Sequence, residues 1–373
     1  MGSTVNNLEY KKDILYASLK KNIQSGLYAP GYQFPKELDL AKLLNVAKVT
    51  IRSALAMLRK DGLIARIRGK GTFVISEETN RGDIVVVVDN INECASPYIY
   101  ILEGIKSAAV HRGINVRICE RYYIESFTGK EFAKSVVDNK ISGILTLGAY
   151  YTGKEKLIRI LTHSNVPVVI PHATGNSYFT TGFACIQIDM RMAWEDAMRH
   201  LRENGHRRIA TIALRKNPDI RGLRSEEHFE LLKKYGADTD RHLFNAISYD
   251  KESIFRSVND WMKLQVPPTA ILCFSDFFAI HVYDALKQLN LKIPEHVAVM
   301  GCCGYPGAGL MTPPLSTVDF RYQEQGESAL ELIMKSDTWF PGELKMAKPR
   351  IIMSHTLVKR ESTNIKIMEN MEV

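Results

Sequence analysis

No apolar segment of the 373-residue sequence is long enough to cross a lipid bilayer, because its strongest apolar stretch, residues 84–88, is only as long as one strand. The chain also opens without the pattern of a secretory leader, since residues 1–25 are polar and amphipathic. Both absences argue against a membrane protein and an exported protein. We therefore expect a cytoplasmic protein with no membrane segment.

Cysteine and histidine are too few and too scattered for a metal centre. The six cysteines lack CxxC spacing, and the ten histidines include no HExxH pair. Several cysteines stand in apolar runs, which predicts buried free thiols in a reducing compartment. There is no GxSxG and no Walker motif, and Gly69-x-Gly71 and Gly301-x-x-Gly304 are too short for a dinucleotide fingerprint. We expect no metal, no cofactor and no enzyme activity.

Net charge is nearly absent outside the first 81 residues. Residues 82–373 contain 35 Lys or Arg against 34 Asp or Glu, whereas residues 1–81 contain 14 against 7 and so carry +7 of the total of +8. A localised basic excess is the footprint of a site for a polyanion, although a solvated basic face is the alternative. The length predicts two or three domains, and 45% hydrophobic residues are ordinary for a globular protein.

The basic segment has the pattern of three helices followed by a hairpin. Apolar spacing predicts helices over residues 8–25, 37–44 and 48–60. The buried stripe of the third helix consists of Ile51, Ala54, Leu55 and Leu58. The residues that we place off this stripe, where they are free to enter a DNA major groove, are Thr50, Arg52, Ser53 and Ala56.

Residues 63–68 and 72–75 read as two strands joined by a tight turn. The turn is Gly69-Lys70-Gly71, where glycine allows a positive φ. Arg68 and Lys70 at this hairpin are expected to meet phosphate or the minor groove. Residues 76–82 contain no apolar side chain and predict a linker.

Four motifs of this segment, at residues 26–31, 34–38, 43–52 and 68–74, resemble the GntR family of bacterial transcription regulators in order and spacing. The resemblance implies a DNA-binding winged helix-turn-helix of the α+β class over residues 1–75, with recognition contacts from Lys48, Thr50 and Arg52. The residues expected beside them are Lys36, Glu37, Arg68, Gly69 and Lys70. The family's usual Ser-Arg is Ala47-Lys48 here, and lysine lacks the bidentate geometry of arginine.

Beyond the linker, strand-like and helix-like segments alternate, which predicts doubly wound parallel sheets. The strand-like segments are residues 84–88, 115–119, 143–147, 167–170, 209–213, 270–273 and 297–300. The helix-like segments include residues 98–112, 192–203, 225–235 and 278–289.

Residues 83–365 resemble the effector domain of LacI-type regulators, with a tail at 366–373. The resemblance rests on motifs at residues 188–189, 201–210, 270–279, 293–301 and 313–318. It implies a two-lobed α/β domain of the type I periplasmic-binding-protein-like fold, with a small ligand between the lobes at the carboxyl ends of strands. Two features depart from the family: Cys302-Cys303 replaces Phe-Asp, and the arginine motif around Arg224 is degraded.

Six residues are candidates for ligand contact: Tyr98, His172, Arg221, Arg224, Asp276 and Phe320. Tyr98 is expected to stack on a sugar face, unless it only packs within its lobe. His172 is expected to hydrogen-bond the ligand, unless it is an ordinary loop residue. Asp276 is expected to accept hydrogen bonds from two hydroxyls, with capping of the following helix as the alternative. Either Arg221 or Arg224 would supply donors, and Phe320 would close the far wall.

A GntR-like reader joined to a LacI-like sensor is similar to arabinose-responsive repressors of the AraR type. That resemblance implies a homodimeric, sugar-controlled repressor that binds double-stranded operator DNA, and induction as the direction of control. The alternatives are a transport solute-binding protein, which the basic winged helix opposes, and an enzyme on an α/β scaffold, which lacks a catalytic constellation. Sequence-specific DNA binding separates the first class from both others.

Overall fold

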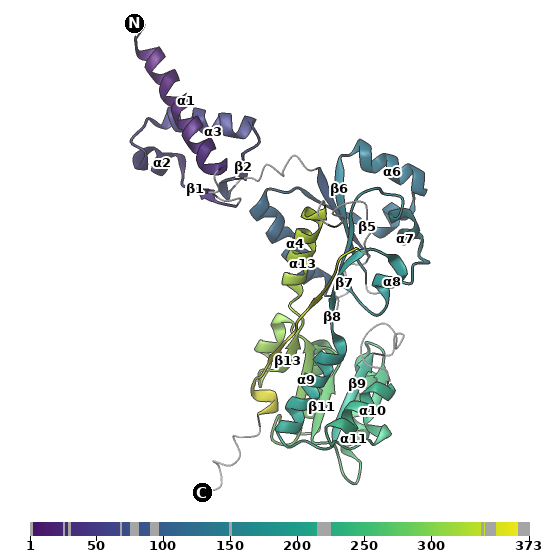
Figure 1. Ribbon diagram of the computed structural model, residues 1–373. Coiled ribbons are helices and arrows are strands. Elements are labelled where there is room, and N and C mark those ends of the chain that lie inside the picture. The colour runs from purple at the N-terminus through teal and green to yellow at the C-terminus, as the bar shows by residue number, and fades with distance from the viewer. Residues whose placement is uncertain are drawn as a thin grey trace.

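The computed structural model describes residues 3–24, 27–28, 31–67, 69–74, 82–89, 97–148, 151–214, 225–336, 339 and 348–364. They form a small N-terminal domain and two α/β lobes that follow one another along the long axis of the molecule (Figure 1). This is the predicted combination of a winged helix with a two-lobed α/β domain.

The N-terminal domain packs three helices against a three-stranded antiparallel sheet in the order β1-β3-β2. Its helices are α1 (Ser3–Gln24), α2 (Glu37–Leu43) and α3 (Lys48–Lys60). Its strands are β1 (Gln33–Phe34), β2 (Ile64–Ile67) and β3 (Gly71–Val74). The core contains Leu19 of α1, Ile51 and Leu58 of α3, and Val74 of β3, each at most 3% exposed. A buried stripe on α3 therefore fixes which face of that helix remains outside.

The first lobe is a six-stranded parallel sheet in the order β14-β8-β7-β6-β4-β5. Its strands are β4 (Asp83–Val88), β5 (Val116–Glu120), β6 (Ile141–Leu147), β7 (Val168–Ala173), β8 (Ala184–Ile188) and β14 (Arg350–Met353). Its helices are α4 (Tyr98–Arg112), α5 (Arg121–Glu125), α6 (Gly129–Asp138), α7 (Lys156–Leu161), α8 (Ser177–Thr181) and α13 (Tyr322–Met334). Alternate residues of β4 enter different cores, with Val86 in one and Val85 and Val87 in the other, because successive side chains point to opposite faces. The sheet is thus covered on both faces.

The second lobe has a six-stranded sheet in the order β10-β9-β11-β12-β13-β15, parallel except for the last pair. Its strands are β9 (Ile209–Leu214), β10 (Phe244–Ile247), β11 (Ala270–Cys273), β12 (Ala298–Cys303), β13 (Ser316–Asp319) and β15 (Thr356–Val358). Its α-helices are α9 (Met190–Glu203), α10 (Ser225–Lys234), α11 (Lys251–Met262) and α12 (Asp276–Gln288), and its short 3-10 helices are η2 (Arg241–Leu243), η3 (Pro306–Leu310) and η5 (Glu361–Thr363).

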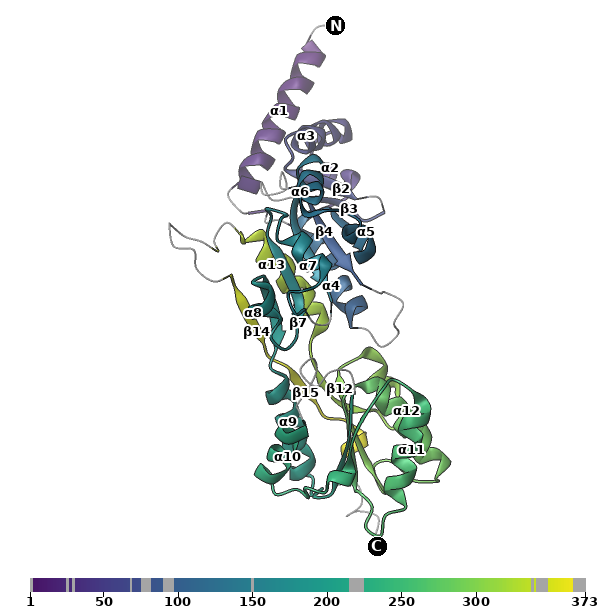
Figure 2. The ribbon, with the colours of Figure 1, turned by 90° about the vertical axis from the view of Figure 1, so that its right-hand side faces the viewer.

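The two lobes are joined by segments that cross from one sheet to the other. Within the described residues the chain passes between the sheets after Ile188, after Asp319 and after Met353. The second crossing brings α13 back onto α4 of the first lobe, where the two helices lie side by side (Figure 2). Arg112 of α4 donates to Glu331 of α13 at 2.5 Å. The three crossings place the ends of strands β8, β13 and β14 at the junction between the two lobes.

The described cysteines are free thiols, in line with the expectation. Cys185, Cys273, Cys302 and Cys303 are buried, and Cys119 is half-buried. Burial raises the pKa of the Cys185 thiol to about 11 and that of Cys303 to about 12, so both remain protonated at neutral pH. Cys94 lies outside the described residues.

Candidate nucleic-acid interface and inter-lobe pocket

The outer face of α3 differs from the face expected from the sequence at two residues, Val49 and Thr50. Thr50 is only 3% exposed, so its placement off the buried stripe is wrong. At 100° per residue, Thr50 lies beside Ala54 on the inner side, whereas Val49 and Arg52 share the outer side. Val49 is 60% exposed and the Arg52 side chain 64% exposed. Val49 was not among the residues expected on this face, although the same helical spacing places it there.

The beginning of α3 carries positive charge without a compensating acid. Lys48 is its first residue and is exposed, no acidic residue lies in the first turn, and Ala47 provides no side-chain cap. A cation at a helix N-terminus opposes the helix dipole, so this lysine does not serve the stability of the helix. The positive end of the helix dipole together with a lysine makes this end of α3 suited to a phosphate group.

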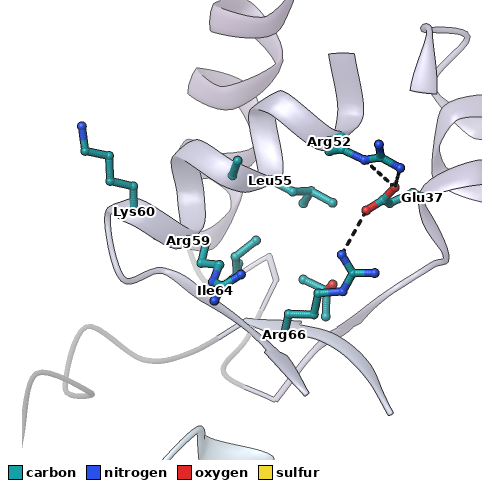
Figure 3. A pocket seen from close by; sticks show the side chains of 9 residues that line it. Glu37, Arg52, Leu55, Arg59, Lys60, Ile64 and Arg66 are labelled. Carbon is teal, nitrogen blue, oxygen red and sulfur yellow. Dashed lines mark hydrogen bonds and ion pairs between the residues drawn. The ribbon is translucent and has the colours of Figure 1, made fainter. Parts of the chain in front are cut away.

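Glu37, at the start of α2, holds two arginines from different elements (Figure 3). Its Oε2 accepts from Arg52 Nε and Nη2 at 3.2 and 3.1 Å, and its Oε1 lies 3.5 Å from Arg66 Nη1 on β2. The Glu37 side chain is 20% exposed, whereas both guanidinium groups are about two-thirds exposed. The carboxylate thus restricts the two arginines while leaving their outer edges open. Arg66 was not among the residues expected from the sequence.

A groove between α3 and β2 carries more positive than negative charge. Its cavity volume is about 490 Å³. The lining residues are Glu37, Arg52, Leu55, Ala56, Arg59, Lys60, Ile64, Arg66 and Thr72. Four cationic side chains against one carboxylate make this surface complementary to a polyanion.

The hairpin tip has the geometry that its glycines predict. Gly69 adopts a φ of +77°, and Lys70 is exposed at the tip. Gln33 of β1 donates through Nε2 to the Lys70 carbonyl at 2.7 Å, which ties the tip to the domain. Lys36 is exposed immediately before α2. Arg68 lies outside the described residues.

A second pocket lies between the two lobes and is lined mainly by rings. The lining residues are Pro97, His172, Thr174, Met190, Tyr249, Phe274, Cys303, Tyr305, Phe320 and Tyr322. His172 and Thr174 come from the end of β7 in the first lobe, and Phe274 and Cys303 from the ends of β11 and β12 in the second. The pocket thus lies where strand ends of both sheets meet, as expected for an α/β fold.

Two of the predicted ligand residues line this pocket, and each is held in place. His172 Nδ1 lies 2.8 Å from Gln325 Oε1, and Gln325 Nε2 donates to the Phe320 carbonyl at 2.6 Å. Because the amide nitrogen is used on Phe320, the amide oxygen accepts from Nδ1 of the imidazole. The His172 ring also contacts Tyr322 edge-on at 5.4 Å between centroids. His172 and Phe320 are therefore fixed parts of the pocket wall.

Asp276 has other partners than those expected. It is 3% exposed and does not line the pocket, and its Oδ1 accepts from Thr317 Oγ1 at 2.6 Å while Oδ2 accepts from the Tyr305 N–H at 2.7 Å. A Cβ on Gly301 would come within 2.2 Å of Oδ1, so the carboxyl group fills the space that glycine leaves. Burial raises the pKa of this carboxyl to about 7, against the opposing effect of these donors. The alternative, capping of α12, is wrong, because the side chain of Ser275 caps this helix.

The other predicted ligand residues are placed differently. Tyr98 is the first residue of α4, is 9% exposed and belongs to the large core, next to the pocket residue Pro97. Arg221 and Arg224 lie outside the described residues. Tyr249, Tyr305 and Tyr322 line the pocket but were not expected from the sequence. Their positions after strands β10, β12 and β13 carried the signal that singled out Phe320.

In the parts of the chain that the structure describes, no group of three or more His, Cys, Asp or Glu residues is placed to hold a metal ion. None of the described helices is both long and apolar enough to span a bilayer.

Comparison with known proteins finds a separate family match for each of two parts of the chain. Residues 11–74 match the family described as bacterial regulatory proteins, gntR family, and residues 198–363 match the periplasmic binding protein-like domain. The arabinose metabolism transcriptional repressor of Geobacillus stearothermophilus is 23% identical over 86% of this chain and 90% of its own length. The transcriptional repressor CytR of Escherichia coli K12 is 26% identical over 67% of this chain and 71% of its own.

Solved structures show the same fold. A complex of the transcriptional regulator CelR with cellobiose has a TM-score of 0.59 and 22% identity, covering 88% of this chain and 100% of that one. A LacI-family regulatory protein from Chloroflexus aggregans has a TM-score of 0.61 and 21% identity, covering 75% and 98%. At this identity the likeness concerns the fold.

The gntR-family match and the two repressors identify the chain as a DNA-binding transcription regulator, and not an enzyme. Within that class, the chain joins a GntR-type DNA-binding domain to a LacI-like, periplasmic-binding-protein-type effector domain.

Proposed function

We propose that this protein is a cytoplasmic, homodimeric repressor of sugar-utilisation genes, whose affinity for operator DNA is set by a small sugar or sugar derivative between the lobes. The proposal rests on one observation: the same chain carries the basic groove between α3 and β2 and a pocket lined by residues of both lobes. The printed function of the Geobacillus stearothermophilus relative, arabinose metabolism, supports the choice of sugar metabolism. The domain limits proposed are 1–75, 76–82 for the linker, 83–365 and a tail at 366–373.

DNA recognition is assigned to the start and the outer face of α3. Lys48 and Arg52 would make the main contacts, with Val49 between them. Lys36, Gly69 and Lys70 would contact the backbone, and Glu37 would position Arg52. Thr50, being buried, would act through the fit of α3 rather than through an open side chain. Arg68 remains part of the proposed wing contact.

We propose a homodimer because one winged-helix domain offers only a small surface to DNA. A single winged helix offers limited contact area, and specific affinity usually requires two half-sites. The main interface would lie in the effector domain, and the operator would be an approximate palindrome. Sedimentation as a monomer at micromolar concentration, with protection of one asymmetric site, would contradict this assignment.

Ligand control would act through the arrangement of the lobes. A ligand that closes the junction changes the separation of the two winged helices, and thereby their fit to half-sites at fixed spacing. The coupling is reciprocal, so operator DNA must change ligand affinity by the same factor. Residues 76–81, which would transmit this change, lie outside the described residues. We favour induction, in which the ligand releases the operator.

The experiment that tests the proposal has two parts. Selection from random duplex DNA with the full-length protein identifies the operator, and a thermal-shift screen of pentoses, hexoses, deoxysugars and uronic acids identifies ligands, because a ligand of the folded state raises apparent stability. Enrichment of one palindromic sequence, together with a ligand that changes affinity for it, is the expected result. Failure to enrich any sequence would refute the function.

A further inference from the structure

We propose that the effector is a glycoside that carries a flat, unsaturated ring, and that the inter-lobe pocket recognises this ring rather than a free sugar. Nucleosides and aryl glycosides share this chemistry. The inference rests on the proposed function and names the ligand class for the same pocket.

The composition of the pocket wall is the first observation. Five of its ten lining residues are phenylalanine or tyrosine, namely Tyr249, Phe274, Tyr305, Phe320 and Tyr322. Among the described lining residues there is no Asp, Glu, Lys or Arg. A free sugar presents hydroxyl groups around its whole edge, and each one that is buried without a partner costs free energy. The hydrogen-bonding side chains of this wall are neutral, namely His172, Thr174 and the tyrosines, and the rest of its surface is apolar, which favours a ligand with an apolar face.

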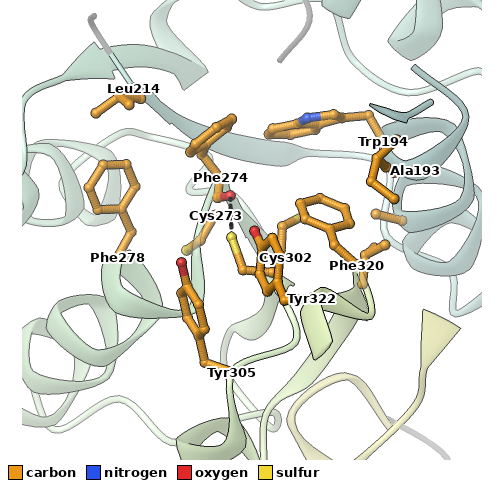
Figure 4. Packing of buried hydrophobic residues seen from close by; sticks show 14 of the residues in the cluster. Ala193, Trp194, Leu214, Cys273, Phe274, Phe278, Cys302, Tyr305, Phe320 and Tyr322 are labelled. Carbon is orange, nitrogen blue, oxygen red and sulfur yellow. Dashed lines mark hydrogen bonds between the residues drawn. The ribbon is translucent and has the colours of Figure 1, made fainter. Parts of the chain in front are cut away.

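The arrangement of the rings is the second observation (Figure 4). Tyr305 and Tyr322 lie nearly parallel, with centroids 5.8 Å apart and an interplanar angle of 21°. Phe320 meets Tyr322 edge-on at 6.0 Å. Phe274 is stacked on Trp194, at 6.3 Å and 30°. Offset and edge-on contacts are the preferred geometries of aromatic rings, so a flat ligand ring can replace one protein ring as a partner without loss of contact.

The nearest buried acid is committed to supporting this wall. Both oxygens of Asp276 are hydrogen-bonded inside the second lobe, and one of them holds the backbone N–H of Tyr305. The carboxylate therefore fixes the segment that carries the Tyr305 ring instead of facing a ligand hydroxyl. Asp276 thus supports the aromatic wall from behind and is not among its lining residues.

The size of the cavity determines how a ligand enters. Its volume is about 20 Å³, which is room for about one water molecule. A ring is admitted only when the aromatic side chains or the lobes move apart. Binding of the ring is therefore coupled to the arrangement of the lobes, which the proposed function requires of an effector.

The test uses matched ligand pairs and the full-length protein. Ribose and methyl riboside are compared with adenosine and cytidine, and glucose and methyl β-glucoside with phenyl β-glucoside, by isothermal titration. We expect a member of one arm to bind at least tenfold more tightly than its free sugar and its methyl glycoside, and the arm that responds identifies the source of the ring. A free sugar or methyl glycoside that binds as tightly overturns the inference but leaves the proposed function standing. Absence of binding in both arms overturns it as well.

Operator titration distinguishes a failure of the proposed ligand class from a failure of the proposed control of DNA binding. If the ring-bearing ligand binds but leaves operator affinity unchanged, the ligand class stands and ligand-controlled repression fails.

Tyr249 provides a variant pair that leaves the core intact, because this side chain is 42% exposed. Tyr249→Phe keeps the ring and removes the hydroxyl group, whereas Tyr249→Leu removes the ring. We expect the Phe variant to keep the affinity for the ring-bearing ligand within about twofold and the Leu variant to lose about tenfold, by analogy with base-stacking side chains. Equal losses in both variants would assign recognition to the hydroxyl group and overturn the inference, as would unchanged affinity in the Leu variant.

Discussion

Replacement of Asp276 by asparagine should stabilise the effector domain at high pH, although Asp276 is buried and both of its carboxyl oxygens accept hydrogen bonds. The pKa of its carboxyl is raised to about 7 from an ordinary 3.8, with burial as the main cause. A carboxyl with a raised folded pKa binds its proton more tightly in the folded chain. Its favourable contribution is therefore present below the unfolded pKa and is lost as the pH rises through about 7.

The magnitude follows from the two pKa values. At about 1.4 kcal/mol for each pH unit between 3.8 and about 7, ionisation of the buried carboxyl costs about 4 kcal/mol by pH 8. Asparagine resembles the protonated acid, since its oxygen can accept from the Tyr305 N–H and its amide can donate to Thr317 Oγ1. Only about two of these pH units lie above pH 5, so the stability of Asp276→Asn relative to the wild type should rise by about 3 kcal/mol between pH 5 and pH 8.

Calorimetry of the full-length proteins at several pH values measures this difference. Burial lowers the pKa values of His206 and His228 to about 4. These groups act in the opposite direction, because their contribution to the stability of the folded protein is lost as the pH falls below 6.5. They are present in both proteins, so they cancel in the comparison. Asp284→Asn, on the exposed side of the same helix, controls for the loss of one charge. A wild-type-to-variant difference that stays constant with pH would refute the reasoning.

The remaining predictions concern DNA. Arg52→Ala should weaken specific operator binding by about 1–3 kcal/mol if Arg52 reads a base edge, with little effect on random DNA. Lys70→Ala should weaken binding to all sequences and reduce the salt slope by about 1, as measured by titration at several salt concentrations. Glu37→Gln should raise affinity for random DNA while lowering discrimination, because it removes a negative charge and frees Arg52; a loss of both would contradict this. We expect Val49 to contact the methyl group of a thymine. Replacing this thymine by uracil should weaken operator binding by about 1 kcal/mol in the wild type and by much less in Val49→Ala, and equal losses would exclude the contact.

The local elements could be predicted where one helix or strand supplied all the information. The apolar spacing of Ile51, Leu55 and Leu58 predicted a helix over residues 48–60, and α3 has these bounds. The assignment of Thr50 to the outer face failed because the stripe was drawn through aliphatic side chains alone, and a small polar residue at its border was placed outside. Contacts between elements were not visible at all: the pairing of Glu37 with Arg66 requires the hairpin to fold back beside α2.

The residues of the inter-lobe pocket could likewise be predicted only in part. Strand ends identified His172 and Phe320, because parallel strands bring their carboxyl ends together. The hydrogen-bond partners of Asp276 could not be predicted, because Tyr305 and Thr317 lie 29 and 41 residues further along the chain. Which groups satisfy a buried carboxyl depends on packing, and sequence spacing does not reveal it.

Titration of the selected operator with full-length protein, with and without the ligand found by screening, tests the central claim most directly. The account predicts sequence-specific binding whose affinity falls by roughly 5–150-fold when the ligand is present, as expected for a coupling of about 1–3 kcal/mol. A rise in affinity would retain the coupling and reverse the direction of control. Operator affinity that does not change with saturating ligand would contradict the account.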